Sequence, residues 1–390
     1  MQVFSVLVFF CGISVFFNSN KTYWFGFASY CLSFVAFIVV RSLFSSRYLG
    51  TLNILLSVFL FLSGIISILQ VFYGAEFYVV NLFSDENYHP PYAVGLGLNS
   101  PNIMGLFILW ALGVQACNLI IYSEHHKAGW FPWVAFIFGV CGVYFTVSRS
   151  VWLGLGIFLL VLLISLVVKG HSLHAFGRIL VVVFLSFLVC NQLPTRSDTQ
   201  EMHKIKWDYI GGPGIKSHVY LWDYISDPGV RSRLYLWNLA AKAIYQQSVF
   251  GSGIGNFEDY LDINDKSYIE LGQRVHLELD MRPKISSDSP LLGPHNSIAE
   301  FILDFGVLAG GVAMSLILFI MFSGMRHPID HPAHIFSLAL VGVIIGMQFN
   351  DLSKERLLWI GLAIIASLSF ARPSNQEEIA SIEPTTQKTT

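Results

Sequence analysis

Long apolar stretches separated by short loops constrain this chain more than any other feature of its sequence. A membrane-spanning helix needs about 20 apolar residues, and stretches near that length recur throughout the 390 residues. Counting them gives about ten predicted spans, at roughly 2–18, 23–40, 52–73, 101–122, 130–147, 151–168, 179–193, 297–321, 335–349 and 356–371. The sequence therefore predicts an all-α protein that crosses a membrane many times.

One long polar segment interrupts these spans. Residues 1–193 hold the first seven predicted spans, residues 194–296 form one large loop, and residues 297–371 hold the last three. Residues 372–390 are polar without apolar periodicity, which predicts a disordered cytoplasmic tail. Loops longer than about 15 residues are uncommon in compact proteins unless they are functional, so the large loop favours an enzyme that works at the membrane surface.

Composition excludes several other classes of protein. Hydrophobic residues make up 54% of the chain and charged residues 12%, whereas soluble domains contain about 25% charged residues. The net charge of -2 excludes a generally basic nucleic-acid binder. All five cysteines lie in apolar stretches, and no cysteine–histidine spacing suggests a zinc site. We therefore expect membrane lipids around the protein, no nucleic-acid partner, no cofactor and no metal.

Basic residues in short loops predict the orientation, because they concentrate on the cytoplasmic side. If both termini are cytoplasmic, one side holds Arg41, Arg47, Lys127, Lys169, Arg178, Arg326 and Arg372. The opposite short loops hold Lys21, Arg149, Lys354 and Arg356. The large loop is then extracytoplasmic.

Arg149 stands between two spans that are separated by almost no loop. A snorkelling anchor is one interpretation of this position. However, positive charge on the outer side runs against the usual topology, and a guanidinium can hold two phosphate oxygens at once. Arg149 is therefore a candidate phosphate ligand.

Within the large loop, Arg231, Arg233 and Trp237 lie on a predicted amphipathic helix whose apolar face would contain Leu234, Trp237, Ala241 and Ile244. Arg233 is either a solvated helix end or a second phosphate ligand. The glycines that follow, Gly251, Gly253 and Gly255, lack the spacing of a phosphate-binding loop. They are expected to let the backbone turn sharply after the helix.

His295 follows Pro294 at the start of the eighth predicted span. A lone histidine is often structural, but at an outer membrane interface it could act as a general base near neutral pH. Glu300 and Asp304 lie one to two turns further along the same helix face. Buried carboxylates need partners, and we expect these to be the three arginines named above. The histidines His327, His331 and His334 have metal-like spacing, but they lie on the predicted cytoplasmic side among prolines.

Taken in order, these motifs resemble the O-antigen ligase and Wzy-type polymerase superfamily. Arg233-x3-Trp237, the run from Phe250 to Phe257, and His295-Asn296-x7-Asp304-x-Gly306 are similar to its signature region. Gly95–Gly105, with Pro101-Asn102, and Ser148-Arg149-Ser150-Val151-Trp152-Leu153 resemble two upstream segments. The resemblance covers roughly residues 90–310.

The resemblance implies a GT-C-like fold in a bacterial inner membrane and metal-independent glycosyl transfer at the periplasmic face. The implied donor is a saccharide linked to undecaprenyl diphosphate. The implied catalytic residues are His295, Arg233 and Arg149. The implied substrate-binding residues are Arg231, Trp237, Asn102, Asn296 and Asp304.

Two acceptors remain open within the superfamily. A ligase transfers the chain to lipid A–core, whereas a polymerase transfers it to another lipid-linked repeat unit. The single dominant loop favours the ligase. A polysaccharide or lipid transporter is the alternative from another class, and it would show broken helices paired between two halves.

Overall fold

A computed structural model describes most of the apolar part of the chain. The described residues are 2–19, 24–74, 77, 92–96, 101–124, 129–171, 173–196, 200, 228–247, 249–257, 296–349 and 356–370. The side chains of residues 25, 122–124 and 228–235 are not described. His295 and most of the predicted large loop lie outside these residues, and so does the predicted tail.

Every regular element among the described residues is a helix. The helices are α1 (Gln2–Phe17), α2 (Trp24–Leu43), η2 (Ser46–Tyr48), α3 (Leu49–Tyr73), α4 (Pro101–Glu124), α5 (Trp130–Phe145), α6 (Arg149–Val168), α7 (Leu173–Gln192), α10 (Pro228–Gln246), α12 (Ser297–Met325), α13 (Pro332–Met347) and α14 (Arg356–Ser369). An apolar helix forms at each of the ten predicted spans. The all-α prediction is therefore confirmed for the described residues.

Length separates these apolar helices into two groups. Six candidate spans are long and apolar enough to cross a membrane, whereas α1, α5, α13 and α14 are shorter apolar helices. At about 1.5 Å per residue, a helix of 16 residues falls short of a hydrocarbon core about 30 Å thick. A count of about ten spans thus stays a prediction. The seventh span is longer than predicted, because α7 begins at Leu173 and includes His174 and Arg178 in its first turns.

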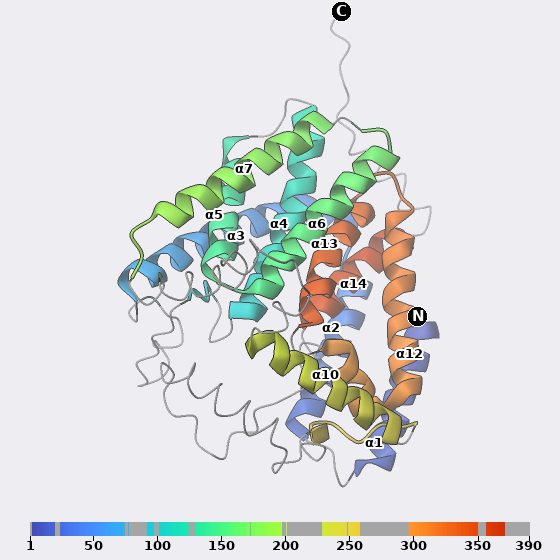
Figure 1. Ribbon diagram of the computed structural model, residues 1–390. Helices are drawn as coiled ribbons and strands as arrows, with labels where there is room; N and C mark the ends of the chain where they lie inside the picture. Colours follow the sequence, from blue (N-terminus) through green and yellow to red (C-terminus); the bar gives the residue numbers. More distant parts are fainter. Residues whose placement is uncertain are drawn as a thin grey trace, which may run out of the picture.

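Helices α4, α6 and α14 surround α13 (Figure 1), and α13 packs against all three of them. At the contact between α6 and α13, a Cβ on Gly154 would lie 2.5 Å from the carbonyl oxygen of Gly342. Small residues allow this close approach of two backbones, as is common between membrane helices. The start of α6, which carries Arg149, is therefore fixed relative to α13.

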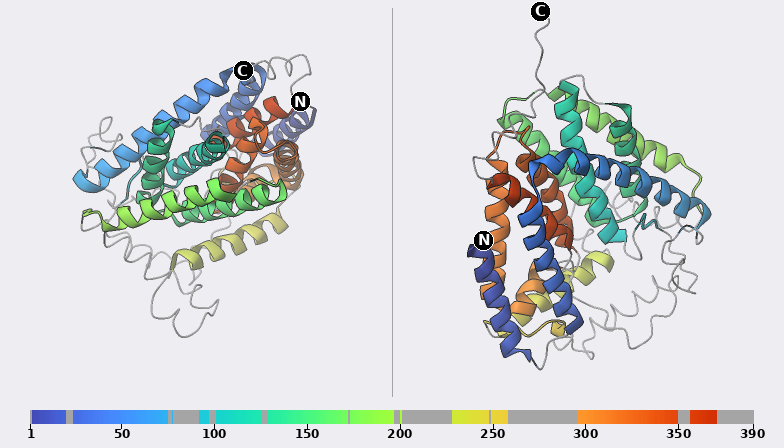
Figure 2. Two further views of the ribbon diagram at one scale, coloured as in Figure 1. Left: turned by 90° about the horizontal axis from the view of Figure 1, so that it is seen from above. Right: turned by 180° about the vertical axis from the view of Figure 1, so that it is seen from behind.

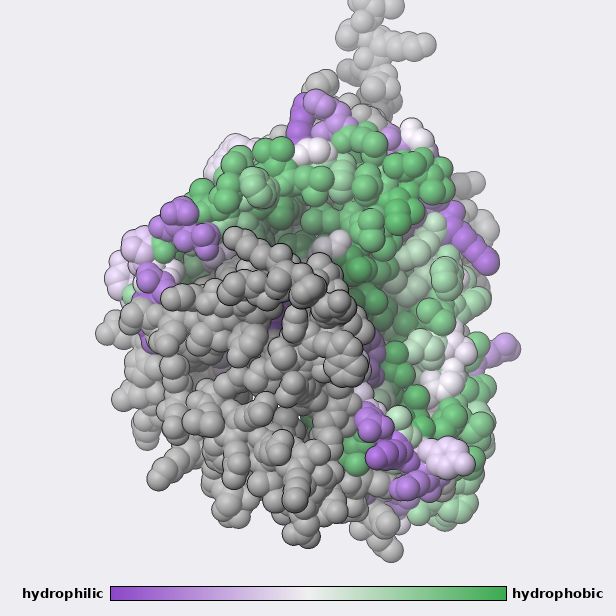
Figure 3. Space-filling view, viewed as in Figure 1, coloured by the Kyte–Doolittle hydropathy of each residue, from purple (hydrophilic) through white to green (hydrophobic). Residues whose placement is uncertain are grey.

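Helix α12 packs against α1, and both lie at one edge of the bundle in the front and rear views (Figures 1 and 2). Helix α10 lies obliquely across the lower end of the bundle in Figure 1. A broad hydrophobic surface covers the upper and right-hand parts of the same view (Figure 3). Exposed apolar side chains of the bundle include Leu180 and Phe184 of α7 and Phe319 and Phe322 of α12. An apolar exterior of this kind suits a lipid environment.

Candidate functional site

The turn before Arg149 is buried and strained. Val147 is fully buried and has a φ of 51°, a conformation that β-branched residues rarely adopt. The hydroxyl of Thr146 donates to the carbonyl of Val143 at 2.8 Å, and the backbone N–H of Ser148 donates to that hydroxyl at 3.4 Å. Helix α6 then begins at Arg149, whose side chain is half-buried. Backbone strain of this kind persists only where the surroundings enforce it.

The start of α4 holds this turn from the other side. The hydroxyl of Ser148 donates to Oδ1 of Asn102 at 2.6 Å and lies 3.0 Å from the hydroxyl of Ser150. The two upstream segments of the predicted site, around Asn102 and around Arg149, are therefore in direct contact. The structure gives Asn102 a role in holding the turn before Arg149.

The same end of the bundle contains the start of α12 and the end of α13. A Cβ on Gly346 of α13 would lie 3.2 Å from the carbonyl oxygen of Ser150. The hydroxyl of Ser297, the first residue of α12, donates to the carbonyl of Met347 at 2.9 Å. Arg149 and the helix that follows His295 are thereby brought to one end of the bundle, which we call the site end.

Three of the predicted cytoplasmic basic residues gather at the opposite end. Nζ of Lys169 donates to the carbonyl of His327 at 2.7 Å, next to Arg326. The hydroxyl of Ser367 donates to the carbonyl of Arg41 at 3.2 Å. This grouping agrees with the predicted division of charge between the two sides, whereas the assignment of each side stays a prediction.

Helix α10 packs on the first turns of α12. Its buried side chains Leu236, Ala240 and Ala243 form a cluster with Phe257 and Leu303. The predicted apolar face was wrong at Ala241, which is exposed while Ala240 is buried, whereas the predicted Ile244 is partly buried against this cluster. Two adjacent alanines give hydropathy no basis for choosing between neighbouring faces.

Trp237 lies at the edge of the buried face of α10, with its ring centroid 5.6 Å from that of Phe349, just after α13. This contact ties α10 to the site end. Arg231 and Arg233 lie on α10, but their side chains are outside the described residues.

The glycine segment after α10 makes the predicted sharp turn. Gly251, Gly253 and Gly255 all have positive φ, at 85°, 95° and 83°. We call residues 249–257 the glycine loop. A Cβ on Gly251 would lie 2.6 Å from the backbone nitrogen of Gly306, so the loop backbone packs directly against the backbone of α12. Glycine is needed here both for its conformation and for this close approach.

Helix α12 breaks where the glycine loop meets it. Gly306 has a φ of 88° and a ψ of 168°, which are non-helical values, and the helix changes direction there (Figure 1). A break leaves the preceding carbonyls without helical partners. Side chains and loop backbone supply donors instead: Nε2 of Gln247 to Ile302 at 3.1 Å, the N–H of Ser252 to Leu303 at 2.9 Å, and the hydroxyl of Ser14 to Asp304 at 3.3 Å.

Asp304 lies at the centre of this junction and is only 6% exposed. One carboxylate oxygen accepts the hydroxyl proton of Tyr30 at 2.9 Å, and the other accepts the backbone N–H of Gly255 at 3.2 Å. Sequence analysis predicted an arginine partner and a substrate-binding role for this residue. Both oxygens accept hydrogen bonds from neutral groups of the protein, and the predicted substrate-binding role stays a prediction. Any arginine partner for Asp304 or for the equally buried Glu300 stays a prediction.

Asn296 caps the first helix turn after His295. Its Oδ1 accepts the backbone N–H groups of Ile298 at 3.1 Å and Ala299 at 2.9 Å. Asparagine is among the preferred residues at this position because it satisfies donors that the helix leaves free. The side-chain oxygen of Asn296 thus has a structural role, and the predicted substrate-binding role of the residue stays a prediction. His295 lies outside the described residues.

The three histidines at the opposite end have structural partners. Nδ1 of His331 accepts the N–H of Ala333 at 3.2 Å and caps α13. The ring nitrogens of His334 meet the hydroxyl of Ser165 at 2.8 Å and the carbonyls of Met325 and His327 at 3.0 Å. Burial, followed by the nearby His327, lowers the pKa of His331 from its ordinary 6.5 to about 4.

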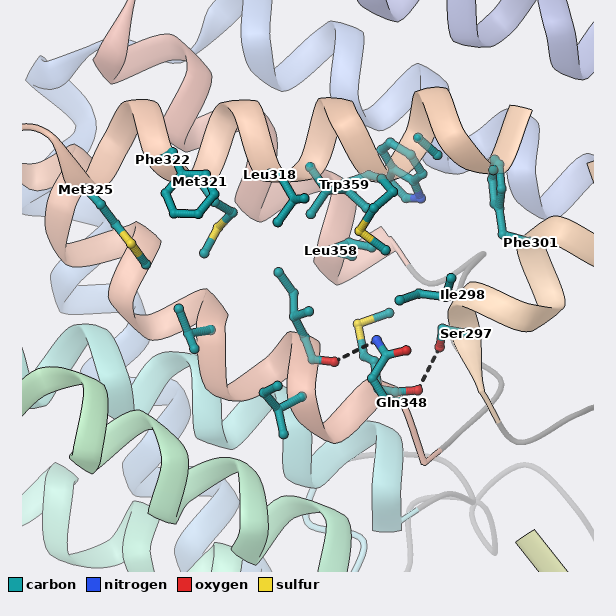
Figure 4. Close-up of a pocket in the computed structure, with 18 residues that line it drawn as sticks. Ser297, Ile298, Phe301, Leu318, Met321, Phe322, Met325, Gln348, Leu358 and Trp359 are labelled. Carbon is teal, nitrogen blue, oxygen red and sulfur yellow. Dashed lines mark hydrogen bonds between the residues drawn. The ribbon is translucent and has the colours of Figure 1, made fainter. Parts of the chain in front are cut away.

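An apolar cavity of about 340 Å³ runs between α12, α13 and α14 (Figure 4). At the site end, it begins beside Ser297 and Gln348, where Nε2 of Gln348 donates to the carbonyl of Ile344 at 2.9 Å. It continues along α12 as far as Met325, and it opens sideways where Leu318 and Phe322 are exposed. Four of its lining residues are methionines, namely Met314, Met321, Met325 and Met347. Methionine adapts easily to irregular apolar ligands.

Several residues that build the site end were not among the residues predicted from the sequence. Gln70 of α3 is fully buried, and its Oε1 accepts the N–H groups of Val94 and Gly95 at 2.9 and 3.0 Å. Ser14 and Tyr30 act on the α12 break from two distant helices. An isolated polar residue in an apolar span was the available signal for each, but a sequence does not show what such a residue faces.

The segments that meet at the site end match a known family. Residues 134–314 match the O-antigen ligase family. The match makes up slightly less than half of the chain and extends from α5 to the second part of α12. It includes Arg149, α10, the glycine loop, His295 and Asp304. A comparison with curated proteins finds no significant match.

The resemblance predicted from the motifs is therefore confirmed. The match supports a multi-pass membrane enzyme of the O-antigen ligase or polymerase type, with lipid-linked polysaccharide as its general class of substrate. Asn102, Ser14 and Tyr30 lie outside the matched residues, although they contact elements within them.

Proposed function

We propose that this protein is an inverting glycosyltransferase that moves a saccharide chain from undecaprenyl diphosphate to an acceptor hydroxyl at the periplasmic face of a bacterial inner membrane. The acceptor we favour is lipid A–core, which makes the protein an O-antigen ligase. The observation that carries the proposal is the family match over the segments that meet at the site end.

The proposed reaction is a single displacement. The acceptor oxygen attacks the anomeric carbon and forms the new glycosidic bond, while the bond from that carbon to the diphosphate oxygen breaks. Undecaprenyl diphosphate leaves with the bonding electrons, and His295 takes the proton of the acceptor hydroxyl. One displacement inverts the anomeric centre.

Arg149, Arg233 and Arg231 are the proposed ligands of the diphosphate. Fixed guanidinium groups stabilise the negative charge that grows on the leaving group, and such preorganised contacts often contribute more to catalysis than any other effect. Trp237 offers an aromatic surface on which a sugar could stack. Asn102, Asn296 and Asp304 each use a side-chain oxygen within the protein, and substrate binding by these three residues remains part of the proposal.

The apolar cavity between α12 and α13 suits the polyprenyl chain of the donor. It is continuous with the site end at Ser297, one residue after Asn296, and it opens sideways toward the surrounding lipid. A donor whose head group lies at the site end can therefore place its tail along α12. This arrangement supports a lipid-linked donor over a soluble sugar nucleotide.

Purified protein in detergent, supplied with donor and each acceptor separately, tests the function. Transfer to lipid A–core that persists with excess EDTA supports a metal-independent ligase, whereas transfer only to a lipid-linked repeat unit would make the protein a polymerase. His295→Ala should lower transfer by about 10²–10⁴-fold while donor binding is retained. Equal loss of binding and transfer would move His295 into the diphosphate site.

A second experiment tests the path of the lipid tail. Ala313 lines the cavity, whereas Gly311 on the same helix faces open space. Ala313→Phe should raise the KM for a full-length donor but not for a donor with a short prenyl chain, and Gly311→Phe should change neither. An equal effect of Ala313→Phe on both donors would exclude the cavity as the tail site.

A further inference from the structure

The buried carboxylate of Asp304 joins three parts of the molecule that lie far apart in the sequence. Its own helix is α12, Tyr30 belongs to α2, and Gly255 belongs to the glycine loop. Because the glycine loop follows α10 directly, its position determines where the C-terminal end of α10 lies. The carboxylate therefore sits between the membrane bundle and the helix that carries Arg231 and Arg233.

Tyr30 is buried with its hydroxyl at this junction. The residue is 1% exposed, and its ring makes edge contacts with Phe301 at 5.7 Å and Phe305 at 4.7 Å between centroids. The hydroxyl donates to Asp304 at 2.9 Å. A carboxylate in apolar surroundings needs donors for its oxygens, and hydrogen bonds to an ionised group are stronger than those between neutral groups.

Helix α1 reinforces the junction on its far side. The hydroxyl of Ser14 donates to the carbonyl of Phe250, and Nδ2 of Asn18 donates to the same carbonyl at 3.1 Å. The rings of Phe17 and Phe250 stack with centroids 4.8 Å apart. The glycine loop is thus fixed by α1 at one end and by Asp304 at the other.

We infer that Tyr30 and Asp304 are positioning residues for the arginine-bearing helix α10. They act through the glycine loop: Tyr30 orients the carboxylate of Asp304, the carboxylate holds the N–H of Gly255, and the loop fixes α10 against the first turns of α12. This role rests on the proposed function, because it concerns the placement of the proposed diphosphate ligands. Tyr30 lies outside the residues that match the family.

Tyr30→Phe tests this role, because it removes one hydroxyl and keeps the ring. Displaced arginines lose contacts that strengthen in the transition state. We therefore expect kcat to fall about tenfold, as loss of a hydrogen bond to a charged group implies, with the KM for donor nearly unchanged. The matched control is Ser33→Ala, because Ser33 is a buried residue of the same helix whose hydroxyl donates within that helix, to the carbonyl of Ser29 at 3.0 Å. An unchanged kcat in folded Tyr30→Phe protein would overturn the inference.

A double-mutant cycle separates positioning from general destabilisation. Asp304→Asn keeps the shape of the side chain but removes one acceptor. If Tyr30 acts through Asp304, adding Tyr30→Phe to Asp304→Asn should lower kcat much less than tenfold further. Independent, multiplying losses would mean that Tyr30 does not act through this carboxylate. If Asp304→Asn fails to fold, the single Tyr30→Phe variant still decides the question.

A distance measurement keeps this inference separate from the proposed function. Spin labels on cysteines replacing Asn238 of α10 and Ser315 of α12, both exposed, report how α10 lies relative to α12 without any substrate. We expect a broader or shifted distance distribution in Tyr30→Phe than in Ser33→Ala protein. If the wild-type protein transfers no saccharide, the proposed function is contradicted, but the distance measurement still tests the positioning role. An identical distribution in both variants would overturn the positioning role.

Discussion

The two arginine-bearing segments of the site end are held in different ways. The turn before Arg149 is fixed locally, by side chains of Thr146, Ser148 and Asn102 around a strained Val147. Helix α10 is fixed remotely, by a glycine loop that packs backbone to backbone against the break in α12. In the first region a lost hydroxyl removes one of several bonds, whereas in the second an added methyl group collides with the main chain.

This difference predicts how each region responds to substitution. A network of side chains loses function gradually, because neighbouring groups and water can replace a missing partner. A contact between two backbones cannot be compensated in this way, because protein interiors are close-packed and cannot move to make room for an added side chain. Substitutions of the glycines whose backbones pack at the break in α12 should therefore affect the whole fold, and those near Arg149 should affect mainly the site.

The largest effect is expected from Gly306→Ala. The positive φ alone costs about 1–3 kcal/mol for a non-glycine residue, and the new methyl group would clash with the carbonyl oxygen of Val249. We expect little folded protein and a clearly lower melting temperature in detergent. The matched control is Gly311→Ala on the same helix, which meets nothing within 4 Å and should be neutral or stabilising by up to about 1 kcal/mol. Similar melting temperatures for Gly306→Ala and Gly311→Ala would show that the backbone contact at the break in α12 is not essential to the fold.

The next largest effect is expected from Arg149→Lys. A lysine keeps the charge but loses the forked contact with two phosphate oxygens, so the rate of transfer should fall by about 10²-fold while the melting temperature stays near that of wild type. The measurement is the rate with saturating donor, beside thermal unfolding of the same preparation. A near-normal rate would identify Arg149 as an interface anchor only.

A smaller effect is expected from Ser148→Ala. The variant loses the bond to Asn102, which costs about 1 kcal/mol and should lower the rate severalfold by loosening the turn before Arg149. The matched control is Ser63→Ala in α3, because the hydroxyl of Ser63 is buried and has no hydrogen-bond partner among the described residues. That control should be neutral. Rates that fall equally in both variants would argue against a specific role for the turn.

The smallest effect is expected at the end of the bundle opposite the site end, where His331 affects the pH dependence of stability. The folded protein holds the pKa of His331 near 4, below its ordinary 6.5, so folding favours the neutral ring. The unfolded chain therefore binds a proton first as the pH falls, and stability present above pH 6.5 is lost progressively toward pH 4. His331→Asn keeps a capping side chain without this titration, so its melting temperature should depend less on pH in that window. Equal pH dependence would show that His331 is not the titrating group.

The positions of the apolar helices follow from the sequence, whereas most contacts between these helices do not. Apolar length predicted each described apolar helix, and the order of motifs predicted the family. The break at Gly306 was not predicted, because the surrounding residues read as one continuous apolar helix. The capping role of Asn296 and the bonds of Asp304 to Tyr30 and Gly255 were not predicted either, since the residue type alone does not show which groups a polar side chain contacts.

The break in α12 also has a consequence for the biosynthesis of the protein. Ser14, near the beginning of the chain, donates to the carbonyl of Asp304, 290 residues later. Tyr30 likewise meets its partner only when α12 has been made. The polar groups of the first two helices can therefore meet these partners only after most of the chain has been translated. Assembly of the site end is consequently a late step, and a chain stopped before Asp304 would lack the bond between Tyr30 and that carboxylate.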